Sequence, residues 1–154
     1  MREILFRGKT SNGEWEYGVP VFSGLNNELA FMKQMHSYDH QVIPETVGQY
    51  TGLTDKNGKK IFEGDIVQYT DEECYYPEEN CDFVGRISLE HGAFGIVTND
   101  NIPIDLNDWC DDDNFVSLWE LYWNLSVEGE ILDMIEIIGN IHDNPELLKE
   151  CEGK

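Results

Sequence analysis

The fold is decided by the stretch VIPETVGQYTGLTDKNGKKIFEGDIV at residues 42–67. It reads as an apolar strand, a polar loop and a second apolar run that a sharp turn interrupts. Asn57 and Gly58 can both take positive φ, which a tight two-residue hairpin turn demands. Gly64 supplies backbone freedom, and Asp65 is of the type that bonds the amides of its own turn. We therefore expect two structural turns, one at Asn57-Gly58 and one at Gly64-Asp65.

Short apolar runs recur on both sides of this stretch. Residues 2–8 read as a first strand, and residues 14–19 alternate polar and apolar as a half-buried strand does. Further strands are expected at residues 29–32, 40–43, 66–69, 83–89, 94–97, 102–106 and 134–141. Strands of this length, separated by Gly, Asn and Asp, predict a mainly β fold built around a small barrel.

The periodicity changes once, near residue 115. Five large apolar residues follow at helical spacing, one face of a helix: Phe115, Leu118, Trp119, Tyr122 and Trp123. A short terminal helix is expected from Pro145. The predicted architecture has an N-terminal β region (residues 1–50) and a C-terminal region (residues 51–154). The second region is expected to be an SH3-like barrel with a helical insertion, and the two can also form one intertwined domain.

The charge of the chain is strongly negative and unevenly placed. It has 10 basic and 31 acidic residues, for a net charge of −21. Residues 1–60 are electroneutral, whereas residues 61–148 hold one basic residue, Arg86, against 22 carboxylates. Such a field repels phosphates and anionic lipid and attracts basic proteins. We therefore expect no direct binding of nucleic acid and allow a basic protein as a partner.

Three ordered motifs resemble the YopX-like family of phage and prophage proteins. They are the opening strand at residues 1–7, the central stretch at residues 42–67, and the closing motif IEIIGNIHDNPELL at residues 135–148. The resemblance implies a phage or prophage setting, so that a basic partner would be a host or phage protein. The absence of catalytic motifs implies a role without enzymatic activity. With no apolar run of about 18 residues and with Glu3 at the start, the sequence predicts neither a membrane span nor a secretory signal. The expected location is the cytoplasm of a bacterial host.

The aromatic segment at 115–123 has two interpretations. Its large side chains can pack in the core of their own subunit, or they can anchor an interface, where aromatic residues dominate the binding energy. A helix face of this size in a small chain favours a homo-oligomer, with Phe115, Leu118, Trp119, Tyr122 and Trp123 as candidate contact residues.

Several residue groups are candidates for chemical sites, but a structural role is favoured for each of them. Asp105, Asp108 and Asp111–Asp113 could supply oxygen ligands, but the ordered spacing of a calcium loop is missing. His36 and His40 stand four residues apart without a supporting zinc motif. The cysteines 74, 81, 110 and 151 have no familiar metal spacing and are expected as thiols. We therefore expect no cofactor, no metal and no catalytic residue.

The favoured function is that of a non-catalytic accessory protein that acts by protein–protein contact. One alternative is an acidic mimic of nucleic acid that inhibits a host DNA-binding protein. A second is a metal-dependent hydrolase or nuclease built on the scattered carboxylates. Glu63 and Asp65 could form a catalytic pair of carboxylates, but a structural role in their turn is favoured. A mimic needs rows of carboxylates at phosphate-like spacing, whereas an enzyme needs them to converge in a pocket with a raised pKa.

Overall fold

The computed structural model describes five stretches of the chain, residues 3–34, 37–70, 82–98, 114–124 and 131–148. It divides into two compact units, Met1–Gly52 (unit 1) and Leu53–Lys154 (unit 2). Both are built mainly of antiparallel strands, which confirms the predicted mainly β class. The predicted strand at residues 102–106 lies outside the described residues. None of the helices in the described part of the chain is long and apolar enough to cross a membrane.

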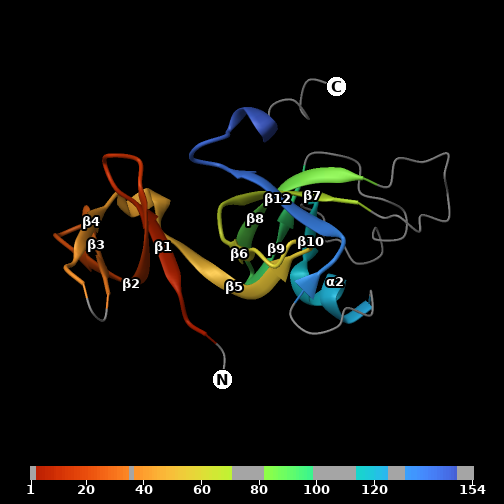
Figure 1. The fold of residues 1–154 in the computed structure, drawn as a ribbon, viewed down its shortest axis with the longest axis horizontal. Coiled ribbons are helices and arrows are strands. Elements are labelled where there is room, and N and C mark those ends of the chain that lie inside the picture. The colour runs from red at the N-terminus through yellow and green to blue at the C-terminus, as the bar shows by residue number, and fades with distance from the viewer. Residues whose placement is uncertain (1–2, 35–36, 71–81, 99–113, 125–130, 149–154) are drawn as a thin grey trace. The chain divides into compact units, whose positions relative to one another are not determined.

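Unit 1 is one antiparallel sheet. Its first four strands form a meander of β1 Phe6–Lys9, β2 Trp15–Ser23, β3 Leu29–Lys33 and β4 His40–Val42. The start of the fifth strand, β5 Gly48–Asp55, pairs with the other side of β1. The strand order within the unit is therefore β5-β1-β2-β3-β4, as Figure 1 shows.

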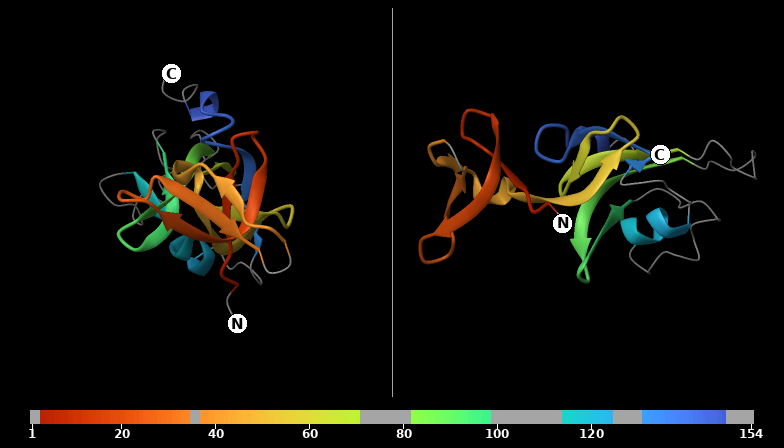
Figure 2. Two further views of the ribbon diagram at one scale, coloured as in Figure 1. Left: turned by 90° about the vertical axis from the view of Figure 1, so that its left-hand side faces the viewer. Right: turned by 60° about the horizontal axis from the view of Figure 1, so that its bottom comes forward.

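The sheet of unit 1 curls until its ends meet (Figure 2). Just beyond β4, the Ile43 N–H donates a hydrogen bond to the Lys9 carbonyl at the end of β1, at 2.8 Å. The 3₁₀ turn η1 Pro44–Thr46 then leads back to β5, and its Thr46 hydroxyl oxygen accepts from the Lys9 N–H at 2.8 Å. The curl encloses a small core of Ala30, Met32 and Val42, against which Phe6 and Val47 pack.

Unit 2 has the same strand order. Its meander consists of β7 Asp65–Tyr69, β8 Phe83–Glu90, β9 Ala93–Val97 and β10 Phe115–Ser117. A helix, α2 Leu118–Asn124, follows, and β12 Ile135–Asn140 returns to pair with β7. The order is β10-β9-β8-β7-β12, so in both units the last strand lies beside the first. Closure of this unit into an SH3-like barrel stays a prediction.

Two short strands complete unit 2. The strand β6 Lys60–Phe62 pairs with β5, and β11 Ile131–Leu132 runs parallel to residues 54–55 of the same strand. A last helical turn covers residues 146–148. The core of this unit is a single cluster of buried residues, Ile61, Val67, Tyr69, Phe83, Ile87, Ile96, Val116, Leu118, Leu121 and Ile135.

The predicted turn at Asn57-Gly58 is of a different type. Gly58 has a φ of +76°, but Asn57 is not in the positive-φ region. The Gly58 N–H donates to the Asp55 carbonyl at 2.9 Å, and the Asp55 N–H donates to the Lys59 carbonyl at 2.8 Å. This pattern is a type I turn followed by one left-handed glycine, so only Gly58 needs the special conformation.

A buried carboxylate that the sequence did not mark organises the same turn. Asp55 is 1% exposed. Its Oδ1 accepts the Asn57 and Lys59 N–H groups, each at 2.9 Å, and its Oδ2 accepts the Ile137 N–H at 3.1 Å. Beside it, the Lys56 N–H donates to the Ile135 carbonyl at 2.9 Å. The central hairpin is thus tied to the start of β12, more than 80 residues further along the chain.

Three substitutions in this turn should differ in cost. Asp55→Ala leaves three amides without their acceptor, so we expect it to lower the free energy of unfolding by roughly 3 kcal/mol. Gly58→Val forces a β-branched residue to a positive φ and should cost about 1 kcal/mol or more. Asn57→Ala should have little effect, because only the backbone N–H of Asn57 serves the turn. Urea unfolding of the three variants gives this ranking; an Asn57→Ala loss as large as that of Asp55→Ala would contradict it.

Candidate functional site

The outward surface of unit 1 carries an apolar patch on β2 and β3. Alternate residues of a strand point to one side of a sheet, and paired residues share that side. Tyr17, Val19 and Val21 of β2 are 46%, 55% and 40% exposed. Val21 pairs with half-buried Phe31 of β3, which places Phe31 on the same side. Leu29, two residues from Phe31, is also exposed. We call Tyr17, Val19, Val21, Leu29 and Phe31 the outer apolar face.

The other side of the same strands faces the core of unit 1. Pro20 pairs with Met32 and Phe22 pairs with Ala30. Met32 and Ala30 are fully buried, whereas Phe22, near the end of β2, is 42% exposed. Gly18 is needed for this approach, because a Cβ there would lie 2.2 Å from the Lys33 carbonyl oxygen. The expected half-buried strand at residues 14–19 therefore exists, but its larger apolar side chains face away from the core. This orientation could not be read from the sequence, because alternation identifies two faces without telling which one is buried.

A basic edge borders the outer apolar face. Lys33 pairs with Val19, and Lys9 pairs with Trp15. The Lys9 ammonium lies 5.9 Å from the Trp15 ring centroid, and the buried Arg7 guanidinium lies 4.5 Å from the same centroid. A carboxylate is present as well, because Asp39 Oδ2 lies 3.4 Å from Lys33 Nζ. The border of the face thus offers charges of both signs.

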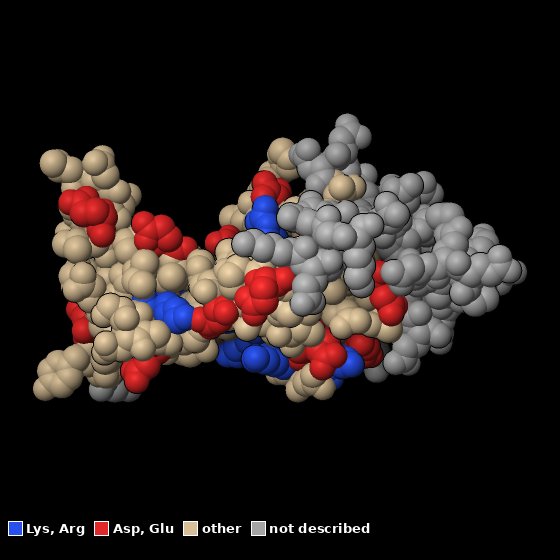
Figure 3. Space-filling view, turned by 90° about the horizontal axis from the view of Figure 1, so that it is seen from above, with Lys and Arg blue, Asp and Glu red and all other residues tan. Residues whose placement is uncertain are grey.

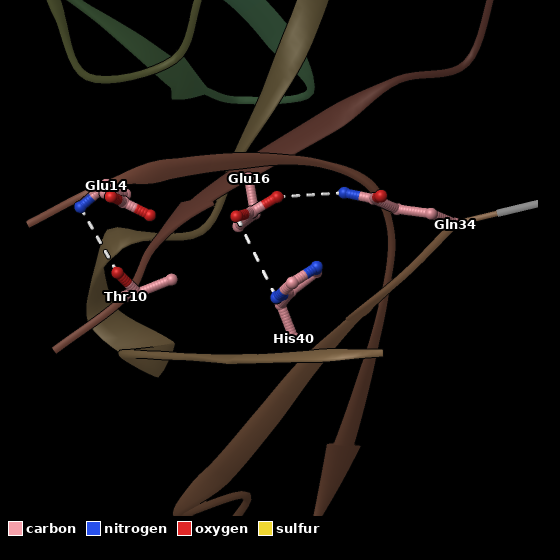
Figure 4. Close-up of polar contacts among 5 residues, drawn as sticks. All are labelled: Thr10, Glu14, Glu16, Gln34 and His40. Atoms are coloured by element: carbon pink, nitrogen blue, oxygen red, sulfur yellow. Dashed lines mark hydrogen bonds and ion pairs between the residues drawn. The ribbon is translucent and has the colours of Figure 1, made fainter. Parts of the chain in front are cut away.

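A polar cluster lies among β2, β3 and β4 of unit 1 (Figure 4). Glu16 Oε2 accepts a hydrogen bond from the Gln34 amide at 2.9 Å, and His40 Nδ1 lies 3.9 Å from Glu16 Oε1. Nearby, the Glu14 N–H donates to the Thr10 hydroxyl at 3.2 Å. His40 thus faces a carboxylate, while His36, its proposed partner in a zinc site, lies outside the described residues. The cluster joins three strands of the curled sheet.

The aromatic segment contributes mainly to the core of unit 2. The predicted helix does not begin at Phe115, which is in β10; α2 begins at Leu118. Phe115 and Leu118 are buried, and Tyr122 packs against the core cluster. Trp119 is 61% exposed, and the Trp123 side chain lies outside the described part. Leu121, which the predicted face omitted, is fully buried; it shares one helix face with Leu118 and Tyr122 by the i, i+3, i+4 spacing.

The turn at residues 63–65 meets the closing motif at one end of β7 and β12. The Gly64 N–H donates to the Ile87 carbonyl, and the Gly64 carbonyl accepts from the Ile141 N–H, both at 2.9 Å. Gly64 has a φ of +91°, and His142 Nε2 lies 3.7 Å from the place a Cβ on Gly64 would take. Asp65 is buried and its Oδ2 accepts the Phe62 N–H at 2.8 Å. Both turn residues therefore have local structural roles.

The closing motif is folded around one asparagine. Asn140, which pairs with Asp65, accepts the His142 and Asp143 N–H groups on its Oδ1 at 3.0 and 2.9 Å. Its Nδ2 donates to Asp143 Oδ2 at 2.9 Å. Glu63 lies half-buried at the same end of the unit, and burial raises the pKa of its carboxyl above the ordinary value. The second and third sequence motifs thus meet in space.

The metal candidates find no geometric support within the described part of the chain, where no group of three or more His, Cys, Asp or Glu side chains could hold an ion. Asp105, Asp108 and Asp111–Asp113 lie outside the described residues, as do all four cysteines. So do more than half of the carboxylates in residues 61–148. On the surface drawn in Figure 3, the described carboxylates are separated by uncharged residues and by a few Lys and Arg side chains.

The fold and the charge define a small, acidic, mainly β protein whose two units share the same strand order. The chain belongs to the YopX protein family, which matches residues 6–149. This match includes the central and closing motifs that meet around Gly64 and Asn140.

A similar fold is found in the crystal structure of protein EF1440 from Enterococcus faecalis. Its sequence is 26% identical, and the match covers 96% of this chain and 99% of that chain, with a TM-score of 0.52. A search of the curated proteins finds no match. Family and fold are therefore established together over nearly the whole chain.

The half-buried carboxyl of Glu63 gives a testable dependence of stability on pH. Because its pKa in the folded protein is raised above 4.5, the fold favours the protonated form. Wild-type stability should therefore fall relative to Glu63→Gln as pH rises from 4.5 through the raised pKa, and the difference should stay constant above it. Urea unfolding from pH 4 to 8 measures this difference. A difference that does not change with pH would contradict the assignment.

Truncation of the neighbouring residues Leu118 and Trp119 of α2 should change the free energy of unfolding by very different amounts. Leu118→Ala opens a cavity in the core of unit 2 and should lower the free energy of unfolding by about 2–5 kcal/mol. Trp119→Ala removes an exposed side chain and should change stability by about 0.5 kcal/mol or less. Thermal or urea unfolding of both variants makes the comparison. Equal losses would mean that Trp119 is packed as deeply as Leu118.

Proposed function

We propose that the protein works by binding another protein through the outer apolar face of unit 1, without catalysing a reaction. The observation that carries the proposal is the side of β2 on which Tyr17, Val19 and Val21 are exposed one after another. Scattered apolar residues are normal on a surface, but contiguous ones with a polar border mark interaction sites. Here Phe31 and Leu29 extend the row onto β3.

The face has the anatomy of a protein interface. Its centre is apolar and includes a tyrosine and a phenylalanine, residue types that supply much of the energy at contacts. Its border holds Lys33 and Asp39. Two strands in regular pairing hold the side chains in place, so little conformational entropy is lost on binding. These properties favour a partner that itself presents an apolar surface.

The placement of the acidic residues favours binding over catalysis. The two best-placed carboxylates of unit 2, on Asp55 and Asp65, are buried and accept hydrogen bonds from backbone amides. Carboxylates used in this way stabilise turns and are closed to a substrate. Glu63 is half-buried at the turn next to Asp65, where Gly64 and the closing motif are bonded to each other.

Charge supports a second kind of contact. Residues 61–148 hold 22 carboxylates and one arginine, so this segment attracts basic protein surfaces and repels nucleic acid. We place such a partner among host or phage proteins in the bacterial cytoplasm, the setting that the family resemblance implies. Contacts of this kind weaken with salt, whereas contacts through the outer apolar face do not.

Site-specific photocrosslinking tests the proposed surface. Tyr17 is replaced by p-benzoylphenylalanine in the full chain, which is expressed in a bacterial host. Leu89 of β8 is the matched control, because both positions are strand residues with 46% exposure. We expect a discrete protein adduct from position 17 after irradiation and none from position 89. An absence of adducts from position 17, or the same adducts from both positions, would refute the assignment of this face.

A further inference from the structure

The partner of the outer apolar face can be identified by its chemistry. Resting on the proposed function of that face, we infer that its occupant is a second copy of this chain, bound face to face about a two-fold axis. Such an isologous contact uses the same patch on both copies and requires a patch that is complementary to itself.

Apolar complementarity is met by the row along β2. Tyr17, Val19 and Val21 lie at alternate positions of one strand, with Leu29 and Phe31 beside them on β3. A copy turned by 180° presents the same row in the opposite direction. The two rows then bury each other, as the inner sides of two packed sheets do.

Charge complementarity is met at the border of the face. Lys33 lies directly across from Val19 on β3, and Asp39 is within 3.4 Å of Lys33. In a two-fold contact, the lysine of one copy can therefore approach the carboxylate of the other. A strongly basic partner would be repelled by Lys9 and Lys33, and a strongly acidic one by Asp39, so a surface carrying both signs fits best.

Net charge decides through which unit two copies meet. Residues 1–52 of unit 1 have four basic and six acidic side chains, a net charge of −2, whereas residues 61–148 have a net charge of −21. Two copies approaching through residues 61–148 would repel each other, and an approach through unit 1 brings together nearly neutral surfaces. The outer apolar face lies in the neutral part of the chain. The contact between copies is therefore expected at β2 and β3 and not at residues 115–123.

The contact is small. It involves two strands of each copy, which places it among interfaces below about 1,200 Å² in total, the class of weak and reversible contacts. We therefore expect a dimer that dissociates on dilution. This dependence on concentration is itself part of the test.

Sedimentation velocity of the purified full chain over a range of concentrations tests the inference. The wild-type protein should shift from the mass of one chain toward twice that mass as its concentration rises. Val19→Asp and Val21→Asp should each raise the dissociation constant about tenfold or more, since each charge occurs twice in a two-fold contact and tenfold corresponds to only about 1.4 kcal/mol. Leu89→Asp, the matched control in unit 2, should behave as the wild type does.

A milder variant guards against loss of folding. The double substitution Val19→Thr and Val21→Thr keeps two β-branched residues in the strand and removes apolar surface only, so it should fold and still weaken the dimer. Trp119→Asp tests the aromatic helix as the alternative contact and should leave the dimer intact. A single-chain mass at every concentration, or a dimer that Trp119→Asp breaks and Val19→Asp does not, would overturn the inference.

The result separates this inference from the function on which it rests. If the protein is a monomer but position 17 still forms an adduct with a different protein, the face binds another partner and only the second-copy inference fails. If the protein is a monomer and position 17 forms no adduct, both fail. An adduct with twice the mass of the chain supports both.

Discussion

Unit 2 depends on the hydrogen bonds that the buried carboxylate of Asp55 accepts. This carboxylate accepts two amides of its own turn and the Ile137 amide of β12. A buried carboxylate is stable only when its oxygen atoms accept hydrogen bonds. Asp55 can therefore be buried only in a fold in which both its own turn and β12 are in place. This requirement links the central motif to the closing motif. At the other end of β12 the link is repeated, because the Ile141 N–H donates to Gly64.

In both units the last strand pairs with the first strand. A meander of four strands has two open edges, and in each unit a fifth strand returns to pair with the first. In unit 1 the curl is tight enough for Ile43 beyond β4 to bond Lys9 at the end of β1. The tight curl leaves a small core of three buried apolar residues. Tyr17, Val19 and Val21 of β2 do not pack in this core and remain exposed on the outer surface, where a partner can contact them.

Much of the fold could be read from the sequence, and the failures have physical causes. Strands at residues 66–69, 83–89 and 94–97 were found because apolar runs between turn residues leave few alternatives. The helix start was placed too early because Phe115 fits helical spacing, although it pairs with Val97 in a strand. The orientation of β2 could not be read, since Gly18 and Pro20 form the inner side by fitting closely against β3. Asp55 looked like an ordinary loop residue because its third partner, Ile137, is distant in sequence.

We infer that two copies of this chain meet through β2 and β3 of unit 1. Backbone amide NMR spectra of the full chain, recorded over a dilution series, test this contact between copies. Amide resonances of residues 17–19, 21 and 29–33 are expected to shift with concentration, while those of α2 stay constant. Shifts concentrated in residues 118–124, or a spectrum that does not change with concentration, would refute it.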